Sequence, residues 1–103
     1  YPNFKKIGVH VKNAPKLKEL YKLRDLAVKN GAEGAIILKF NNKLYAPEYE
    51  HEQDYKEFER FFDFENNDVL VIAFSSDKKD AENAALAIAV ELSGNLKKFI
   101  SEL

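Results

Sequence analysis

Two adjacent asparagines, Asn41 and Asn42, restrict the fold of this chain more than any other pair of residues. They separate two β-prone runs, at 35–40 and 43–49. Asparagine tolerates positive φ, and two such residues between β-prone runs are typical of a tight hairpin turn. A hairpin forces the two strands to pair in antiparallel fashion.

Apolar spacing in the rest of the chain predicts two more strands and three helices. Alternation predicts a half-buried strand, a short uninterrupted apolar run predicts a buried strand, and apolar side chains three and four residues apart predict a helix. Asn13 to Pro15 and Ser75 to Asp77 supply the side chains expected at helix starts. The predicted elements are strands at 4–11 and 69–74, a turn at 66–68, and helices from 13 to 31, from 53 to 64 and from 75 to 92.

The order of these elements, β-α-β-β-α-β-α, predicts an α+β fold. A four-stranded, largely antiparallel sheet with helices over one face closes such a chain into layers. We expect residues 1–103 to form a single domain, because 103 residues are about the size of one hydrophobic core.

A second apolar stripe lies near the end of the chain, in the segment 95–103. Its members are spaced as one face of a short final helix. Such a helix needs a surface for its apolar side, so we predict either contact with another subunit or docking on the parent domain. The candidate interface residues are Leu96, Phe99, Ile100 and Leu103.

The composition excludes several classes of protein. The chain has no cysteine, so disulfides and thiolate chemistry are impossible. Its longest apolar runs, 69–74 and 84–90, are far shorter than the roughly 18–20 residues that cross a bilayer. The sequence opens without a signal-peptide pattern, and we therefore expect a cytoplasmic protein with no membrane partner.

The charge is divided unequally along the chain. Residues 1–47 contain ten basic and three acidic residues, whereas residues 48–103 contain six basic and fourteen acidic ones. The net charge of −1 therefore conceals a half of charge +7 and a half of charge −8. Such asymmetry is typical of a surface that binds a polyanion, or of subunits that meet basic face to acidic face.

No pattern of residues indicates an enzyme, so we predict no catalytic residue, no metal and no cofactor. The acidic run 48–54, which includes His51, reads as a solvated loop before a helix. His10 is typical of a semi-exposed packing residue on a strand. Ser75 and Ser76 are explained by helix capping, and the four glycines form no phosphate-binding loop.

Lysines and aromatic residues of the first half support a nucleic-acid hypothesis. Single-strand binding needs cations along the phosphates and ring faces on which bases stack, and aromatic residues make up 13% of the chain. We predict an oligomeric binding protein for single-stranded DNA, or RNA, that does not read sequence. The hypothesis requires the candidate residues to share one surface. They are Lys6, His10, Lys18, Lys22, Lys39, Lys43, Tyr45 and Tyr49.

The stretch from Gly31 to Pro47 (GAEGAIILKFNNKLYAP), the strand from Asp68 to Phe74 (DVLVIAF) and the alanine-rich helix after it resemble ThermoDBP and its relatives. These are single-stranded DNA-binding proteins of thermophilic archaea. The resemblance implies a four-stranded antiparallel sheet flanked by helices, an apolar cleft edged with basic residues, and oligomerisation through helices. The acidic residues at 48–68 depart from that pattern.

A second resemblance leads to a different function. The strand Gly34 to Leu38 (GAIIL) and the short hairpin after a first helix are similar to the Roadblock and profilin-like group. That group implies a dimerising scaffold or a regulator of small GTPases. Here only one strand is predicted after the second helix, where that group has more, so we rank this reading second.

Overall fold

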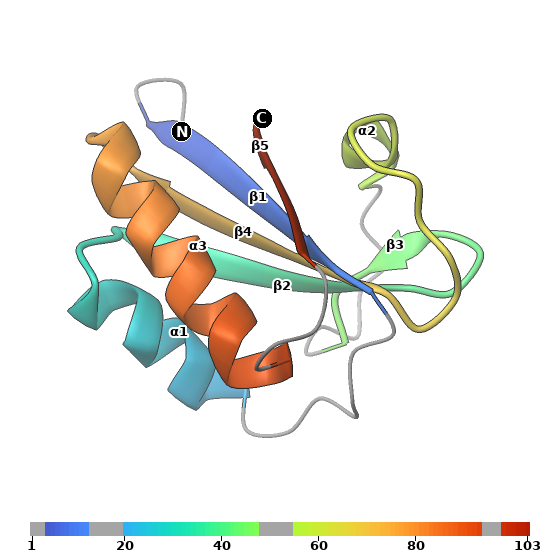
Figure 1. Cartoon of the computed structure of the whole chain (residues 1–103), viewed down its shortest axis with the longest axis horizontal. Helices are drawn as coiled ribbons and strands as arrows, with labels where there is room; N and C mark the ends of the chain where they lie inside the picture. The colour runs from blue at the N-terminus through green and yellow to red at the C-terminus, as the bar shows by residue number, and fades with distance from the viewer. Residues whose placement is uncertain (1–3, 13–19, 48–54, 94–97) are drawn as a thin grey trace.

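A computed structural model describes residues 4–12, 20–47, 55–93 and 98–103 of the chain. These parts contain five strands and three helices (Figure 1). The strands are β1 (Lys5–Val11), β2 (Gly34–Phe40), β3 (Leu44–Tyr45), β4 (Val69–Ser75) and β5 (Lys98–Glu102). The helices are α1 (Leu20–Lys29), α2 (Lys56–Glu59) and α3 (Lys78–Ser93).

All five strands form one antiparallel sheet in the order β3-β2-β4-β1-β5. Helix α1 connects β1 to β2, and α3 connects β4 to β5, which is the connectivity of a split β-α-β, or ferredoxin-like, unit. Strand β3 and helix α2 lie in the connection between β2 and β4. This connection distinguishes the chain from the plain split β-α-β unit, and it builds the site described below.

One face of the sheet is covered by α1 and α3 (Figure 1). Alternate residues of each strand point to this face, among them Val9 of β1 and Val71 of β4, and both are fully buried. Helix α3 packs through alanines, including Ala81, Ala85 and Ala89, which are also fully buried. Side chains this small allow a helix to pack close to a sheet.

The opposite face of the sheet is covered by the chain between β3 and β4 rather than by long helices. Leu38 and Leu70, which alternate with the residues of the helix face, pack there under Phe58, Phe62 and Phe64. The sheet is therefore buried on both faces. We call the chain between β3 and β4 the insertion. The apolar residues under the helices and those under the insertion form two separate clusters.

The predicted α+β class is confirmed, with five strands instead of four. The hairpin turn has Asn42 at a φ of 63°, the left-handed conformation expected there, and the predicted turn at 66–68 also contains a left-handed residue, Asn67 at 78°. Helix α3 begins after Asp77, whose carboxylate accepts the backbone N–H groups of Lys79 and Asp80 at 2.8 and 3.2 Å. No described helix combines the length and apolar character needed to span a membrane.

Two predicted helices are wrong in extent or type. Within the described part of 53–64, the predicted helix is a single turn, Lys56–Glu59, and Phe62 and Phe64 reach the sheet from the irregular segment that follows it. The helix predicted in 95–103 is strand β5, which pairs with β1 and covers its outer edge. Phe99 and Ile100 thus leave on opposite faces of the sheet, and Leu96 lies outside the described residues.

The cap of α3 gives a direct test of the helix boundary. Replacing Asp77 by alanine removes the acceptor of two N–H groups and should lower the free energy of unfolding by about 0.5–2 kcal/mol. Urea unfolding followed by circular dichroism measures this change. The variant Asp77→Asn keeps a capping oxygen and should retain most of the stability. An alanine variant as stable as the parent would show that the cap is not formed.

Candidate ligand pocket beside a buried histidine–aspartate pair

His10 of β1 and Asp68, which precedes β4, form a buried polar pair on the face of the sheet that the helices leave open. Their side chains are 1% and 2% exposed, and Nε2 of His10 lies 2.7 Å from Oδ2 of Asp68. An ionised carboxylate only accepts hydrogen bonds, so the ring N–H donates to it. A polar group costs free energy when it is buried without a partner, and each member of this pair supplies that partner to the other.

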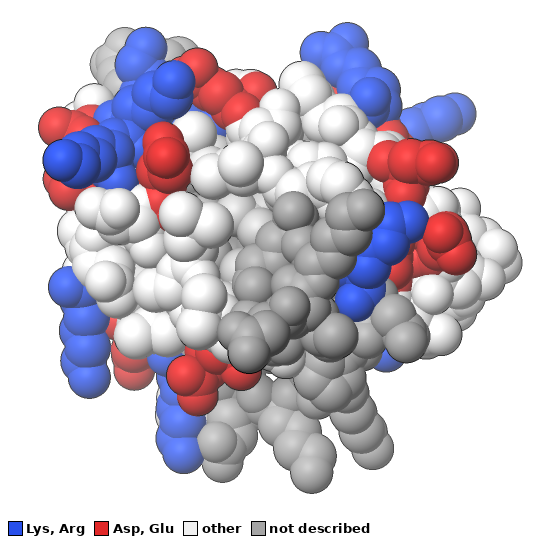
Figure 2. Space-filling view, in the orientation of Figure 1, with Lys and Arg blue, Asp and Glu red and all other residues white. Residues whose placement is uncertain are grey.

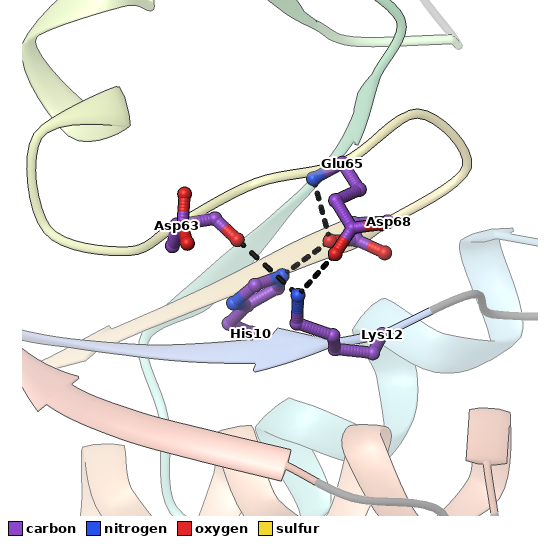
Figure 3. A network of polar contacts seen from close by, with 5 residues as sticks. All are labelled: His10, Lys12, Asp63, Glu65 and Asp68. Atoms are coloured by element: carbon purple, nitrogen blue, oxygen red, sulfur yellow. Dashed lines mark hydrogen bonds and ion pairs between the residues drawn. The ribbon is translucent and has the colours of Figure 1, made fainter.

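Backbone hydrogen bonds fix the position of Asp68. Its Oδ2 also accepts the N–H of Glu65 at 2.9 Å, while its own N–H donates to the carbonyl of Glu65 at 3.1 Å. Its carbonyl accepts the N–H of Phe40 at 2.9 Å, which ties the turn to β2. The carboxylate is thus anchored to the turn before β4 and reaches across to β1 (Figure 3).

Aromatic rings surround the imidazole of His10. The ring centroid of His10 is 4.5 Å from that of Phe64, 5.4 Å from that of Phe62 and 5.7 Å from that of Phe99. Phe62 and Phe64 come from the insertion between β3 and β4, whereas Phe99 comes from β5. Two segments that are distant in the sequence therefore meet over one side chain of the central sheet.

A pocket of about 460 Å³ opens between the insertion and β5 at this point. Its aromatic lining comes from Phe61 and Phe62 of the segment between β3 and β4 and from Phe99 of β5, and the buried His10 contributes to its floor. Phe99 is 39% exposed, so part of the apolar wall faces solvent. Its remaining lining residues are Lys12, Asp63, Ile100 and Ser101.

The rim of the pocket carries both signs of charge. Nζ of Lys12 donates to Oε1 of Glu65 at 3.0 Å and to the carbonyl of Asp63 at 3.4 Å (Figure 3). The hydrogen bond to the Glu65 carboxylate raises the pKa of Lys12 above its usual value. The guanidinium of Arg60 lies 5.1 Å from the ring centroid of Phe61, which places a second cation beside an aromatic wall.

The polar groups of the pocket do not form a metal centre or a nucleophile–base pair. Within the described parts of the chain, no three histidine, aspartate or glutamate side chains gather as metal ligands. The acidic run 48–54 lies outside those parts. The hydroxyl of Ser101 donates to the carbonyl of Glu102 at 3.3 Å, and no hydrogen bond between described residues joins it to His10.

The structure does not gather the sequence-predicted nucleic-acid residues on one surface. Lys6 and His10 leave β1 on the face opposite the helices, and His10 is buried rather than semi-exposed. Lys22 is exposed on α1, in the helix layer. Among the described candidates, only those of the hairpin lie together: Lys39 pairs directly with Tyr45, and Lys43 lies in the turn between them.

Two of the candidates, Lys18 and Tyr49, lie outside the described residues. Figure 2 shows lysine and arginine side chains at several separate places on the visible face, with acidic side chains beside many of them. The charge asymmetry of the sequence is thus not expressed as one basic groove on that face.

The residues that do form a site were missed by the sequence interpretation for a physical reason. The members of the His10–Asp68 pair are 58 positions apart and share no local motif. Phe61, Phe62 and Phe99 were assigned to helix faces, whereas they line a pocket from an irregular segment and from a strand. The one usable signal was Asp68, an acidic residue directly before the apolar strand β4. A carboxylate buried there needs a hydrogen-bond donor from elsewhere in the chain.

Comparisons with known proteins support a family assignment and a fold. Residues 2–92 match the model of the family described as "Domain of unknown function (DUF4443)". No curated protein matches the chain. Among solved structures, the chain is similar to "Hypothetical protein PH0730 from Pyrococcus horikoshii OT3", with 31% identity and a TM-score of 0.71. The match covers 84% of this chain and 49% of the other, so this chain spans about half the length of that relative.

The buried pair predicts a strong effect of a single substitution. Asp68→Ala removes the acceptor of the His10 ring N–H and of the Glu65 N–H, and unfolding should become easier by about 2 kcal/mol or more. Asp68→Asn keeps an acceptor oxygen and should lose less. Lys12→Ala removes a solvent-exposed ion pair and a long hydrogen bond to the Asp63 carbonyl, and it should leave the unfolding midpoint nearly unchanged. Equal midpoints for Asp68→Ala and Lys12→Ala would contradict a structural role for the pair.

Proposed function

Because the chain belongs to the family described as DUF4443, and that description names no activity, we propose a function from the site itself. The proposed function is a binding module that takes an unpaired nucleobase of single-stranded nucleic acid into the pocket between Phe61, Phe62 and Phe99. The observation that carries the proposal is a set of partly exposed rings, from two separate segments, around one pocket.

Stacking is the interaction that this geometry favours. Every base has a flat π-face, and a base stacked on an aromatic side chain contributes about 1–3 kcal/mol of binding free energy without regard to sequence. Phe61 and Phe99 both line the pocket and come from two different segments of the chain, so a planar group that enters has rings from both segments within its reach. A volume of about 460 Å³ lies within the usual range for small-ligand sites.

The surrounding charges argue for stacking over phosphate binding. Lys12 is bound to Glu65, and Asp63 is on the same rim, so the local field favours a phosphate only weakly. Arg60, beside Phe61, is the cation best placed to approach a phosphate or a base. The mechanism proposed here therefore differs from the lysine–phosphate mechanism that the sequence suggests.

The His10–Asp68 pair is assigned a supporting role in this proposal. A histidine held by an aspartate is also the orienting half of catalytic triads. A triad additionally needs a nucleophile bonded to the histidine, and the Ser101 hydroxyl is instead bonded to the Glu102 carbonyl. The pair is therefore proposed to hold the floor of the pocket rigid beneath the stacked base.

Removing one ring face tests the proposal. Phe61→Leu keeps an apolar side chain but removes the stacking surface, and it should weaken binding of a labelled oligo-dT by about tenfold. Fluorescence anisotropy measures the affinity. The matched control is Tyr21→Leu, which removes an exposed ring from α1, away from the pocket, and should have no effect.

Competition by other ligands in the same titration tests whether the protein binds an unpaired base. Thymidine should compete weakly with oligo-dT, whereas a duplex of equal length should not compete, because its bases are paired. Equal losses of oligo-dT affinity in Phe61→Leu and Tyr21→Leu would contradict the proposal. Duplex binding as tight as single-strand binding would also contradict it.

The mixed charge of the rim predicts a shallow dependence of affinity on salt. A protein that contacts many phosphates loses about 10³–10⁵-fold in affinity between about 50 and about 200 mM salt. If stacking dominates, the loss over this interval should stay below about tenfold. A steep loss in the same titration would favour the lysine–phosphate mechanism and place the binding surface elsewhere.

A further inference from the structure

Strand β5 carries an outer edge that no other described strand pairs with. We infer that two copies of this chain pair through β5 in antiparallel fashion, with Ile100 opposite Ile100 of the second copy. The pairing would join two five-stranded sheets into one. It does not depend on what the pocket binds.

The backbone of β5 presents the groups that this register needs. The N–H of Leu103 donates to the carbonyl of Lys6 at 2.9 Å, so Leu103 points its backbone groups toward β1. Hydrogen-bonding direction alternates along an antiparallel strand, and Ile100 and Glu102 therefore point their N–H and C=O groups away from β1. A two-fold axis at Ile100 brings these outward groups of two copies face to face.

The charges along β5 select the same register independently. With Ile100 at the centre, position 102, a glutamate, lies opposite position 98 of the second copy, a lysine in the sequence, and this juxtaposition occurs twice across the two-fold axis. Opposite charges directly across an antiparallel pair stabilise it, whereas like charges destabilise it. Within its own chain, Oε1 of Glu102 lies 3.5 Å from Nζ of Lys78, and both side chains are about half exposed.

The exposed apolar surface also lies on this edge. Phe99 is 39% exposed on the pocket face, and Ile100 is 47% exposed on the helix face. Proteins usually protect an edge strand with charges, proline or a bulge, so large apolar side chains on an open edge mark a pairing surface. In the proposed register Phe99 lies opposite Ser101 of the second copy, which adds a ring to each pocket.

Charge exchange tests the register. The mass of the full chain should approach twice 11.8 kDa in sedimentation equilibrium as concentration rises. Glu102→Lys places like charges opposite each other twice and should weaken self-association about tenfold or more. The double variant Lys98→Glu with Glu102→Lys restores opposite charges and should restore self-association. Lys78→Ala, which removes only the contact within one chain, should leave it unchanged.

A backbone variant tests the edge without using charge. Ile100→Pro removes an N–H that faces solvent in one copy, which an edge strand tolerates, but it blocks pairing with a second strand. This variant should be folded and monomeric, whereas Ile100→Val should self-associate like the parent. A parent chain that stays at 11.8 kDa at every concentration would overturn the proposal. So would a charge exchange that fails to restore association, or an Ile100→Pro variant that still associates.

Discussion

The hydrogen bond between His10 and Asp68 is the interaction on which the pocket depends. It joins a central strand to the turn that precedes β4, and both side chains are removed from water. A buried polar pair is favourable only when each partner is held in place, and the backbone contacts of Asp68 with Glu65 and Phe40 provide that hold. The insertion is thereby fixed over a face of the sheet that the helices do not cover.

Two different parts of the fold form the main apolar core and the proposed binding site. Helices α1 and α3 and the inward residues of the sheet form one apolar cluster, which contains most of the buried aliphatic side chains. The insertion between β3 and β4 forms the second cluster, which is rich in phenylalanine and opens at its margin into the pocket. Sites placed on one rigid sheet by a variable connection are common in proteins. The proposed base-binding site follows that pattern, and the proposed β5 pairing would set two such sites beside one symmetry axis.

The sequence predicted the parts of this structure that depend on local patterns. The strand β1, the asparagine turn at Asn42 and the cap at Asp77 are all set by residues near one another in the chain, and each is confirmed. The prediction that β1 is only half-buried is wrong, because the segment between β3 and β4 covers its second face. The fate of Phe99 was not predictable in this way. The spacing of Phe99 from neighbouring apolar residues fits a helix. In the folded chain, however, this segment pairs with the outer edge of β1 as a strand, and that edge exists only once the sheet has assembled.

The central claim is that a planar base lies against the rings of the pocket, and intermolecular NOE measurements test it most directly. A protein labelled with ¹³C in its phenylalanine rings, mixed with unlabelled oligo-dT, should give cross-peaks from the thymine methyl and H6 protons to Phe61 and Phe99. Cross-peaks confined to other phenylalanine rings, or chemical-shift changes centred on the Lys39–Tyr45 hairpin, would contradict the account.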